Sequence, residues 1–171
     1  MAGSARNFII RGATQHDAEA MAHIEEAARA LIQEQGISLD FLEIPDDFTE
    51  PTDWDLGLAA EVDGHIVGMV RVTELDSDPV ALDQVSVHPS LSHQGIGRAL
   101  LLATADLCRK RGYTAVTGTT FREVVFNAHF YAALGAIEDP HPHPAMAGRR
   151  RVEADIGLDA RGPRTVMRVT L

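Results

Sequence analysis

The sequence predicts a single α/β (α+β) domain in which helices flank a mixed, mostly antiparallel central sheet. Two observations favour this class. The chain has 171 residues, 45% of them hydrophobic, and a chain of this size buries roughly 70% of its unfolded surface in one core. Strand-like and helix-like segments also alternate along its whole length, and no repeat, low-complexity block or linker divides it. We therefore expect one domain over residues 1–171.

A strand and a helix are predicted at the start of the chain. Residues 8–13 form a short strand-like run. Thr14, followed three positions later by Asp17, makes a capping-box pattern that marks a helix start. Apolar residues then recur at helical spacing until Gly36, a residue type that often ends helices.

An acidic loop and a hairpin come next. Residues 37–55 hold two prolines, seven acidic residues and no basic one, which predicts an irregular, solvated loop. The strand-like runs 56–61 and 65–75 flank the dipeptide Asp63-Gly64. This dipeptide favours a type I′ turn, so the two runs are expected to pair antiparallel.

A parallel crossover follows the hairpin. Residues 80–88 form a further strand, and regular alternation would place one set of side chains on a single face of the sheet: Ala81, Asp83, Val85 and Val87. Residues 95–111 have the apolar spacing of a strong helix, and residues 113–121 are rich in Thr and Val like a strand. A strand-helix-strand unit of this kind gives the sheet a parallel pair.

The remainder of the chain predicts two helices and a final strand. Asn127 can cap a short helix that continues to Leu134, and residues 145–156 form a longer helix. Residues 164–171 form a C-terminal strand, which we expect at an exposed edge of the sheet. An exposed edge can pair with a second copy of the chain, so a homodimer is one expected assembly.

Charge is divided unevenly along the chain. The whole sequence carries a net charge of −10, from 15 Lys and Arg against 25 Asp and Glu. Residues 1–85 hold 4 basic and 18 acidic side chains, a net of −14, whereas residues 86–171 hold 11 and 7, a net of +4. The total argues against nucleic-acid binding, which needs a basic surface. The division predicts two ligands of opposite charge on the two halves.

Other features of the composition predict a soluble, cytoplasmic protein. No uninterrupted apolar run exceeds five residues, so neither a membrane span nor a signal peptide is expected. The single cysteine, Cys108, cannot form an internal disulfide. It shares a predicted helix face with Leu101 and Thr104, so a buried thiol is expected rather than a nucleophile.

The most informative stretch is the turn before the strong helix. A strand ends at Pro89, a polar turn follows, and Gly95 and Gly97 open the helix beside Arg98. Glycines let a ligand approach the backbone, and the first-turn N–H groups have no acceptors within the helix. Such a turn suits a phosphate or pyrophosphate. It is not a P-loop, because no Lys-Ser or Lys-Thr follows, and it lacks the third glycine of a dinucleotide fingerprint.

This stretch resembles a known family. Val87-His88-Pro89 followed by Gly95-Ile96-Gly97-Arg98-Ala99-Leu100 is similar to the acetyl-CoA pyrophosphate loop of the GNAT superfamily of N-acetyltransferases. Phe130-Tyr131-Ala132-Ala133-Leu134-Gly135-Ala136 resembles the tyrosine-bearing helix of the same family. The order of predicted elements agrees from Phe8 to Leu171.

The resemblance implies a GNAT-like fold, acetyl-CoA as acyl donor and no metal. Two neighbouring strands of that fold splay apart, and backbone groups beside the pantetheine arm would come from Val85, Ser86 and Val87. The turn would wrap the pyrophosphate with Ser92, His93, Gln94, Gly95, Ile96, Gly97 and Arg98. Tyr131 would protonate the departing thiolate, since a phenol and an alkyl thiol have similar ordinary pKa values. Phe130 and Asn127 would lie along the cofactor, although Asn127 is also the helix cap described above.

Three positions depart from the family pattern. Ser92 stands where the family loop usually has Arg or Gln, and Val124 stands where it often has a pantetheine-binding Asn. Ala81 stands where some members have a glutamate base. A lysine-like amine is only about one part in 10³ neutral at pH 7, so a proton acceptor is expected. Asp83, two residues from Ala81, is the first candidate for this base; Glu123 and a water are the others.

Together these features predict direct transfer of an acetyl group to a primary amine of a small molecule or peptide within a ternary complex. A non-catalytic acyl-CoA-binding or sensing module is the alternative. The acidic segment 40–55 would attract a cationic acceptor or simply solubilise the chain, and residues 149–151, all arginine, would form a solvated helix face or meet the 3′-phosphate. A metal hydrolase built on His141 and His143 is the third and weakest reading, because further ligands at a recognisable spacing are missing.

Overall fold

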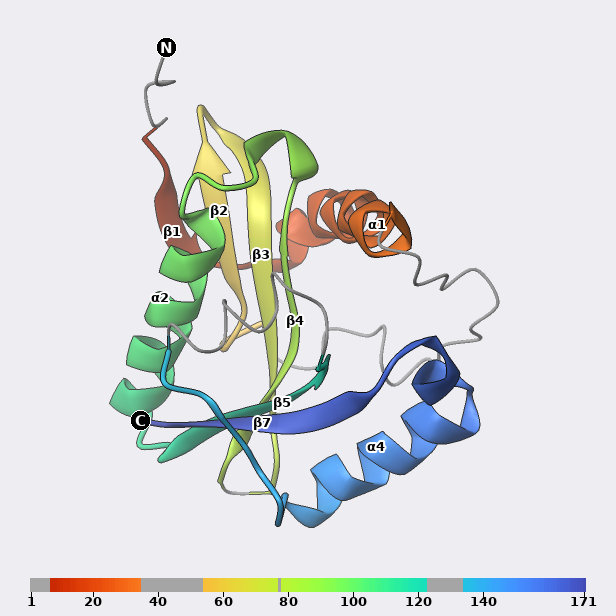
Figure 1. Cartoon of the computed structure of the whole chain (residues 1–171). Helices are drawn as coiled ribbons and strands as arrows, with labels where there is room; N and C mark the ends of the chain where they lie inside the picture. The colour runs from red at the N-terminus through yellow and green to blue at the C-terminus, as the bar shows by residue number, and fades with distance from the viewer. Residues whose placement is uncertain (1–6, 35–53, 77, 123–133) are drawn as a thin grey trace.

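A mixed sheet with helices on both faces forms the centre of the molecule, which we describe from a computed structural model covering residues 7–34, 54–76, 78–122 and 134–171 (Figure 1). Within these residues the sheet has seven strands in the order β1-β2-β3-β4-β5-β7-β6. The strands are β1 (Ile9–Gly12), β2 (Leu58–Val62), β3 (His65–Glu74), β4 (Val80–Val87), β5 (Ala115–Phe121), β6 (Ile137–Glu138) and β7 (Arg164–Thr170). The α-helices are α1 (Ala18–Glu34), α2 (Ile96–Lys110) and α4 (Pro144–Asp155), and the short 3₁₀ helices are η1 (Gln15–Asp17), η3 (Pro89–Leu91) and η4 (Leu158–Arg161).

Local sequence explains the first half of the sheet. Asp63 and Gly64 both have positive φ, 50° and 80°, as a type I′ turn requires, and the β2–β3 hairpin is confirmed. Strands β1 to β4 pair antiparallel, and β4 and β5 then pair parallel across the α2 crossover. The predicted mixed, mostly antiparallel sheet is therefore confirmed.

The prediction that the C-terminal strand forms an edge is wrong. Strand β7 lies between β5 and β6, and it pairs antiparallel with both. Strand β6 pairs with Met167 and Arg168, so the middle of β7 is not available for pairing with a second copy of the chain. The two-residue strand β6, for which the sequence shows no strand pattern, occupies the edge instead.

Helices cover the two faces of the sheet separately. Helix α2 lies on one face and its Leu100 belongs to a core cluster with Val70 and Leu82. Helices α1 and α4 lie on the opposite face (Figure 1), where Met21 of α1 packs on Met69 and Met146 of α4 packs on Ala81. Neighbouring residues of one strand point to opposite faces of the sheet. The same strands therefore contribute to the core under α2 and to the clusters under α1 and α4. Among the described residues, no helix has both the length and the apolar character needed to cross a membrane.

Cys108 is part of the α2 core, as predicted. Its side chain is fully buried, and burial raises the pKa of its thiol to about 11. The thiol therefore stays protonated at neutral pH and is a poor nucleophile.

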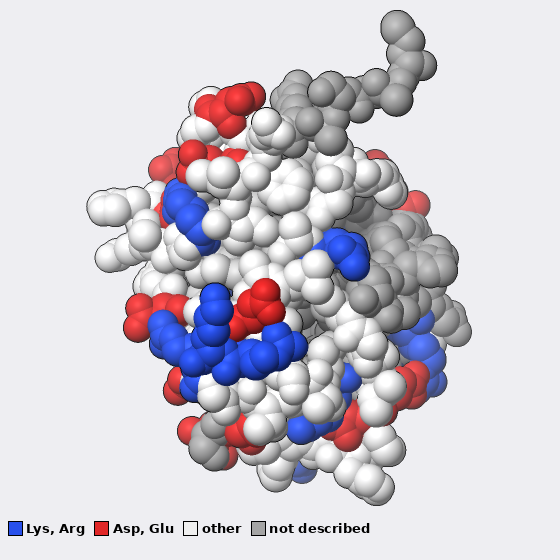
Figure 2. All heavy atoms as spheres, turned by 90° about the vertical axis from the view of Figure 1, so that its left-hand side faces the viewer, with Lys and Arg blue, Asp and Glu red and all other residues white. Residues whose placement is uncertain are grey.

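Helix α2 is seated by a close approach at Gly68 of β3. A Cβ atom at this position would lie 3.1 Å from Leu100 Cδ1, 3.2 Å from Ser86 O and 3.3 Å from Ile96 Cγ2. The first turns of α2 therefore rest directly on the β3 backbone. At the other end of the helix, Arg109 and Lys110 favour the negative end of the helix dipole. Basic side chains gather beside acidic ones on this side of the molecule (Figure 2).

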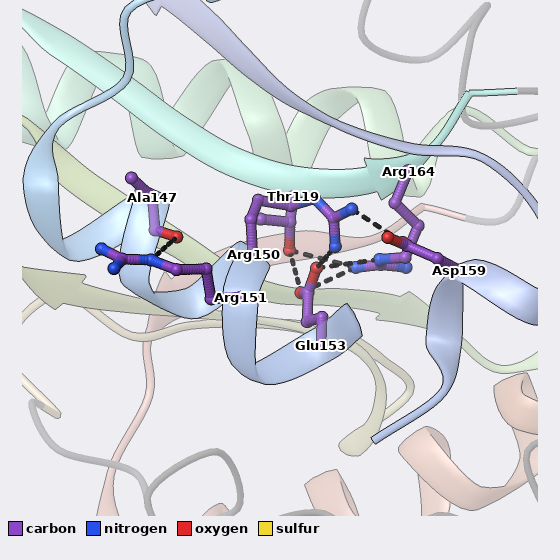
Figure 3. A network of polar contacts seen from close by, with 7 residues as sticks. All are labelled: Thr119, Ala147, Arg150, Arg151, Glu153, Asp159 and Arg164. Atoms are coloured by element: carbon purple, nitrogen blue, oxygen red, sulfur yellow. Dashed lines mark hydrogen bonds and ion pairs between the residues drawn. The ribbon is translucent and has the colours of Figure 1, made fainter. Parts of the chain in front are cut away.

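Helix α4 is held to the sheet by charges around Glu153, whose side chain is 5% exposed (Figure 3). Arg164 of β7 donates two hydrogen bonds to its carboxylate, at 2.9 and 3.0 Å. Thr119 of β5 and Arg150 complete the set at 2.5 and 2.8 Å. Burial raises the pKa of Glu153, but the bonds and charge of Arg164, with the other two donors, outweigh it and leave the pKa below its ordinary value.

The predicted cap at the start of the first helix is present. The carboxylate of buried Asp17 accepts hydrogen bonds from the Thr14 backbone N–H at 2.8 Å and the Thr14 hydroxyl at 3.0 Å. Arg11 of β1 pairs with the same carboxylate through two bonds of 2.8 Å. This cluster fixes the path of the chain from the edge strand into α1.

We expect Asp17→Asn to lower the free energy of unfolding by about 1–3 kcal/mol at neutral pH, because a buried charged pair is broken. The hydrogen bonds from Arg11 hold the pKa of Asp17 well below its ordinary 3.8. Its contribution is therefore present above about pH 4 and lost as the pH falls through the lowered pKa. Urea unfolding at neutral and acidic pH measures it, with the exposed Glu19→Gln as control. An equal loss in the two variants, or a difference that does not shrink in acid, would contradict this role.

Candidate active site

Strands β4 and β5 part after a very short pairing. Their ladder consists of Val80↔Val116 and Ala81↔Thr117. Strand β5 continues to pair with β7 as far as Phe121↔Arg164, so the two strands diverge rather than end. The second half of β4 therefore has its β3 side paired and its other side turned toward the opening between the strands. This is the splay that the family resemblance implied, and it places the backbone of Val85, Ser86 and Val87 along the opening.

A β-bulge at Asp83 changes which residues of β4 share a face. The register with β3 runs from Val72↔Leu82 to Arg71↔Gln84, so Asp83 is the extra residue. A bulge reverses the alternation that follows it. Ala81 and Asp83 lie on the α4 side, whereas Val85 and Val87 pack into the core cluster of α2. The expectation that all four share one face is therefore wrong beyond Asp83.

Polar side chains gather on the α1 and α4 face of β3 and β4. We call this set the polar strip: Arg71, Thr73, Asp83, Gln84 and Ser86. Ser86 is buried and the other four are half-buried. Gln84 Nε2 donates to Ser86 Oγ at 2.7 Å, and Thr73 Oγ1 donates to Asp83 Oδ2 at 2.6 Å. The candidate base thus lies in an interior polar environment immediately after the last β4–β5 pair.

Arg149 of α4 contacts the candidate base directly. Its Nη2 lies 2.6 Å from Asp83 Oδ1, and the two side chains are 18% and 16% exposed. The neighbouring Arg150 is bound to Glu153 and Asp159, at 2.8 and 2.7 Å. The prediction of a solvated arginine face therefore holds only for the exposed Arg151, which donates to Ala147 O (Figure 3).

Two residues of the glycine turn have a left-handed backbone conformation. His93 and Gly95 have positive φ, 62° and 81°, and Gly95 caps α2. The first helical bond runs from Ala99 N to Gly95 O at 3.0 Å, so the N–H groups of residues 96–98 precede the helical ladder. At the start of the turn, His88 Nδ1 lies 2.8 Å from Ser90 Oγ.

Side chains in this turn divide into exposed and buried ones. His93 and Arg98 are exposed, and Ser92 and Gln94 are half-buried. Ile96 is 1% exposed and packs in the core with Gly68 behind it. Ile96 therefore offers a ligand its backbone N–H and not its side chain. Of the predicted contact between Ile96 and the pyrophosphate, only a backbone contact is possible.

A small apolar pocket lies on the α2 face next to the point of divergence. Residues from β4, β5 and α2 line it, among them Leu82, Gly118, Leu101 and Thr104. A Cβ atom at Gly118 would lie 3.1 Å from Leu82 O, so the glycine lets β5 approach β4 where the strands separate. The opening therefore has an apolar wall on one face of the sheet and the polar strip on the other.

Several predicted site residues lie outside the described residues: Tyr131, Asn127, Phe130, Glu123 and most of the acidic segment 40–55. Among the residues that are described, no group of three or more His, Cys, Asp or Glu side chains could hold a metal ion. His143 instead caps α4 by accepting from Ala145 N at 3.3 Å.

Arg71 was not predicted as a site residue, and Arg149 was expected on a solvated face or at the 3′-phosphate rather than at Asp83. Arg149 reaches Asp83 only through tertiary packing, and the run of three arginines gives no sign of which one turns inward. Arg71 carried a usable signal, because it and Thr73 are polar residues two apart in a strand whose interior is otherwise apolar. Polar residues at that spacing lie on the same face of a strand and indicate that this face is not part of the apolar core.

The divergent strands, the glycine turn and the two-faced opening agree with a family comparison. The model of the Acetyltransferase (GNAT) family matches residues 18–136. The chain belongs to this family and is an acyltransferase.

Solved structures share the fold over nearly the whole chain. The PaiA N-acetyltransferase from Thermoplasma acidophilum, in complex with coenzyme A, is 16% identical with a TM-score of 0.71, over 96% of this chain and 99% of that one. The ribosomal-protein-S18-alanine N-acetyltransferase from Escherichia coli is 18% identical with a TM-score of 0.66, over 96% and 94%. The N-acetylglutamate synthase from Neisseria gonorrhoeae, complexed with coenzyme A and N-acetyl-glutamate, is 20% identical with a TM-score of 0.68, over 96% of this chain and 35% of that one.

We expect Gly68→Ala to destabilise the protein by about 1–3 kcal/mol, because the added methyl group overpacks the contact that seats α2. Gly148→Ala is the matched control, since a Cβ there meets nothing within 4 Å and alanine favours the α4 helix. Thermal unfolding compares the two variants. Wild-type stability in Gly68→Ala would show that α2 can shift on β3 without cost.

Proposed function

We propose that this protein transfers an acetyl group from acetyl-CoA directly to a primary amine within a ternary complex. The divergence of β4 from β5 beside the glycine turn is the observation that carries the proposal. It leaves a strand backbone and a set of helix N–H groups adjacent to one opening, as a thioester with a pyrophosphate tail requires. The coenzyme A in the structures of two fold neighbours supports the choice of donor.

The glycine turn is the proposed pyrophosphate site. The N–H groups of residues 96–98 and the positive end of the α2 dipole would hold the phosphates, with exposed Arg98 adding positive charge. Ser92, His93 and Gln94 would contact the phosphates from the start of the turn. The backbone of Val85 to Val87 would pair with the pantetheine arm, and an N–H of this segment would polarise the thioester carbonyl.

The proposed reaction needs one proton removed and one supplied. The amine nitrogen attacks the thioester carbonyl, the C–N bond forms, and the C–S bond then breaks to release coenzyme A. Asp83 would take the proton from the amine, directly or through water, because its two oxygens keep lone pairs beyond those used by Thr73 and Arg149. Tyr131 would give a proton to the departing thiolate.

A non-catalytic acyl-CoA-binding module is the second candidate. Two observations favour it: Ala81 occupies the position where some family members have a strand glutamate, and both oxygens of Asp83 are already in contact with protein groups. Thiol release with acetyl-CoA and a broad panel of amines distinguishes the two functions. A module of this kind would bind the cofactor tightly and release no thiol above the rate of hydrolysis.

We expect Tyr131→Phe to lower kcat by about 10- to 10³-fold with little change in coenzyme A affinity, because the phenol gives a proton and is not needed for binding. Tyr113→Phe is the control, since Tyr113 is the chain's other tyrosine and its hydroxyl bonds to Glu74. Stopped-flow or steady-state thiol release gives kcat, and calorimetry gives the affinity. Equal rates for the two variants would remove Tyr131 from the mechanism.

A further inference from the structure

The face of the sheet that carries the polar strip also carries two apolar clusters. Helix α1 covers one apolar cluster, which includes Ala59 and Met69, and α4 covers another, which includes Ala81 and Val166. The polar strip lies on the same face along β3 and β4. A helix packed on a sheet normally buries apolar side chains, so this band of polar residues is not explained by the packing of either helix.

One ion pair joins this strip to α4. Arg149 Nη2 and Asp83 Oδ1 are 2.6 Å apart, and each side chain keeps less than a fifth of its surface exposed. Both groups are thus largely withdrawn from bulk water. Opposite charges in such a setting interact more strongly with a ligand than surface charges do, because water screens them less.

The Asp83–Arg149 pair lies beside the point where β4 and β5 separate, which is where the reaction is proposed to occur. Asp83 follows the last β4–β5 pair by two residues and is the bulged residue at which β4 turns away. It lies on the face opposite α2 and the apolar pocket. On the proposed function, an amine that approaches the thioester from this face would come close to the Asp83–Arg149 pair.

We propose that the Asp83–Arg149 pair selects an acceptor that carries a carboxylate beside its amine, as an α-amino acid does; the inference rests on the proposed function. An α-amino acid holds its ammonium and carboxylate on one carbon, so its two charges match a protein pair whose charged atoms are 2.6 Å apart. The substrate ammonium would take the place of Arg149 at Asp83. The substrate carboxylate would bind the guanidinium of Arg149, a group suited to two parallel hydrogen bonds.

The neighbouring arginines of α4 cannot serve in the same way. Arg150 is bound to Glu153 and Asp159, and Arg151 is exposed and bonded to Ala147 O. Arg149 is therefore the arginine of this run that faces the strip. A polyamine acceptor would meet a guanidinium beside the carboxylate it needs, which is unfavourable for a second cation.

The test compares each α-amino acid with its carboxamide, using acetyl-CoA and thiol release. We expect kcat/KM to favour the amino acid by about 10- to 100-fold, the usual worth of a charged hydrogen-bonding partner. Arg149→Met should abolish this preference and Arg149→Lys should restore part of it. Arg151→Met, two positions further along the same helix and exposed, should leave the preference unchanged.

Binding provides a readout independent of turnover. Calorimetry in the presence of coenzyme A should show that amino acids bind more tightly than their amides, and that Arg149→Met removes the difference. If no amine is acetylated but this dependence on Arg149 persists, the proposed function fails and the recognition site stands. If wild-type protein treats acids and amides alike in both assays, or if the Arg149→Met variant keeps the preference, the inference is overturned. Equal treatment of acids and amides by the wild-type protein overturns the inference even if Arg149→Met does not fold.

Discussion

The early separation of β4 from β5 is the constraint on which the rest of the site depends. Two residue pairs join these strands, whereas β5 pairs with β7 along its whole length. Continuous pairing would give every backbone group of β4 a partner and close the sheet. Because the pairing stops at Ala81, the bulge at Asp83, the pocket on the α2 face and the polar strip on the other face all border one opening.

Each face of the sheet supports this opening by a different kind of interaction. On the α2 face the support is apolar, since Gly68 lets Leu100 and Ile96 rest on the β3 backbone and fixes the glycine turn relative to β4. On the other face the support is ionic, because Glu153 ties α4 to β5 and β7 (Figure 3). The overall charge of −10 therefore says little about the site. What matters there is which individual charges the fold turns inward.

Local patterns predicted most of the fold. Asp63-Gly64 specifies its own turn, and the apolar spacing after Gly95 specifies the α2 helix, because these signals act over a few residues. Two motifs, the glycine turn before α2 and the segment around Tyr131, were enough to predict the family. The bulge could not be predicted, since Asp83 is an ordinary strand residue and the extra position shows only in its pairing with β3. The inner position of β7 likewise depends on β5 and β6, whose paired residues lie about fifty and about thirty positions away along the chain.

The short strand β6 has a consequence for how this enzyme can diversify. Strands β6 and β7 are hydrogen-bonded neighbours, so the segment that carries α4 leaves and re-enters the sheet at adjacent places. A segment with adjoining ends can be lengthened, shortened or exchanged at small entropic cost to the rest of the chain. The elements proposed to hold the cofactor, β4 and α2, lie wholly outside it. Chimeras joined at β6 and β7 would therefore replace α4 and its arginines while leaving β4 and α2 intact.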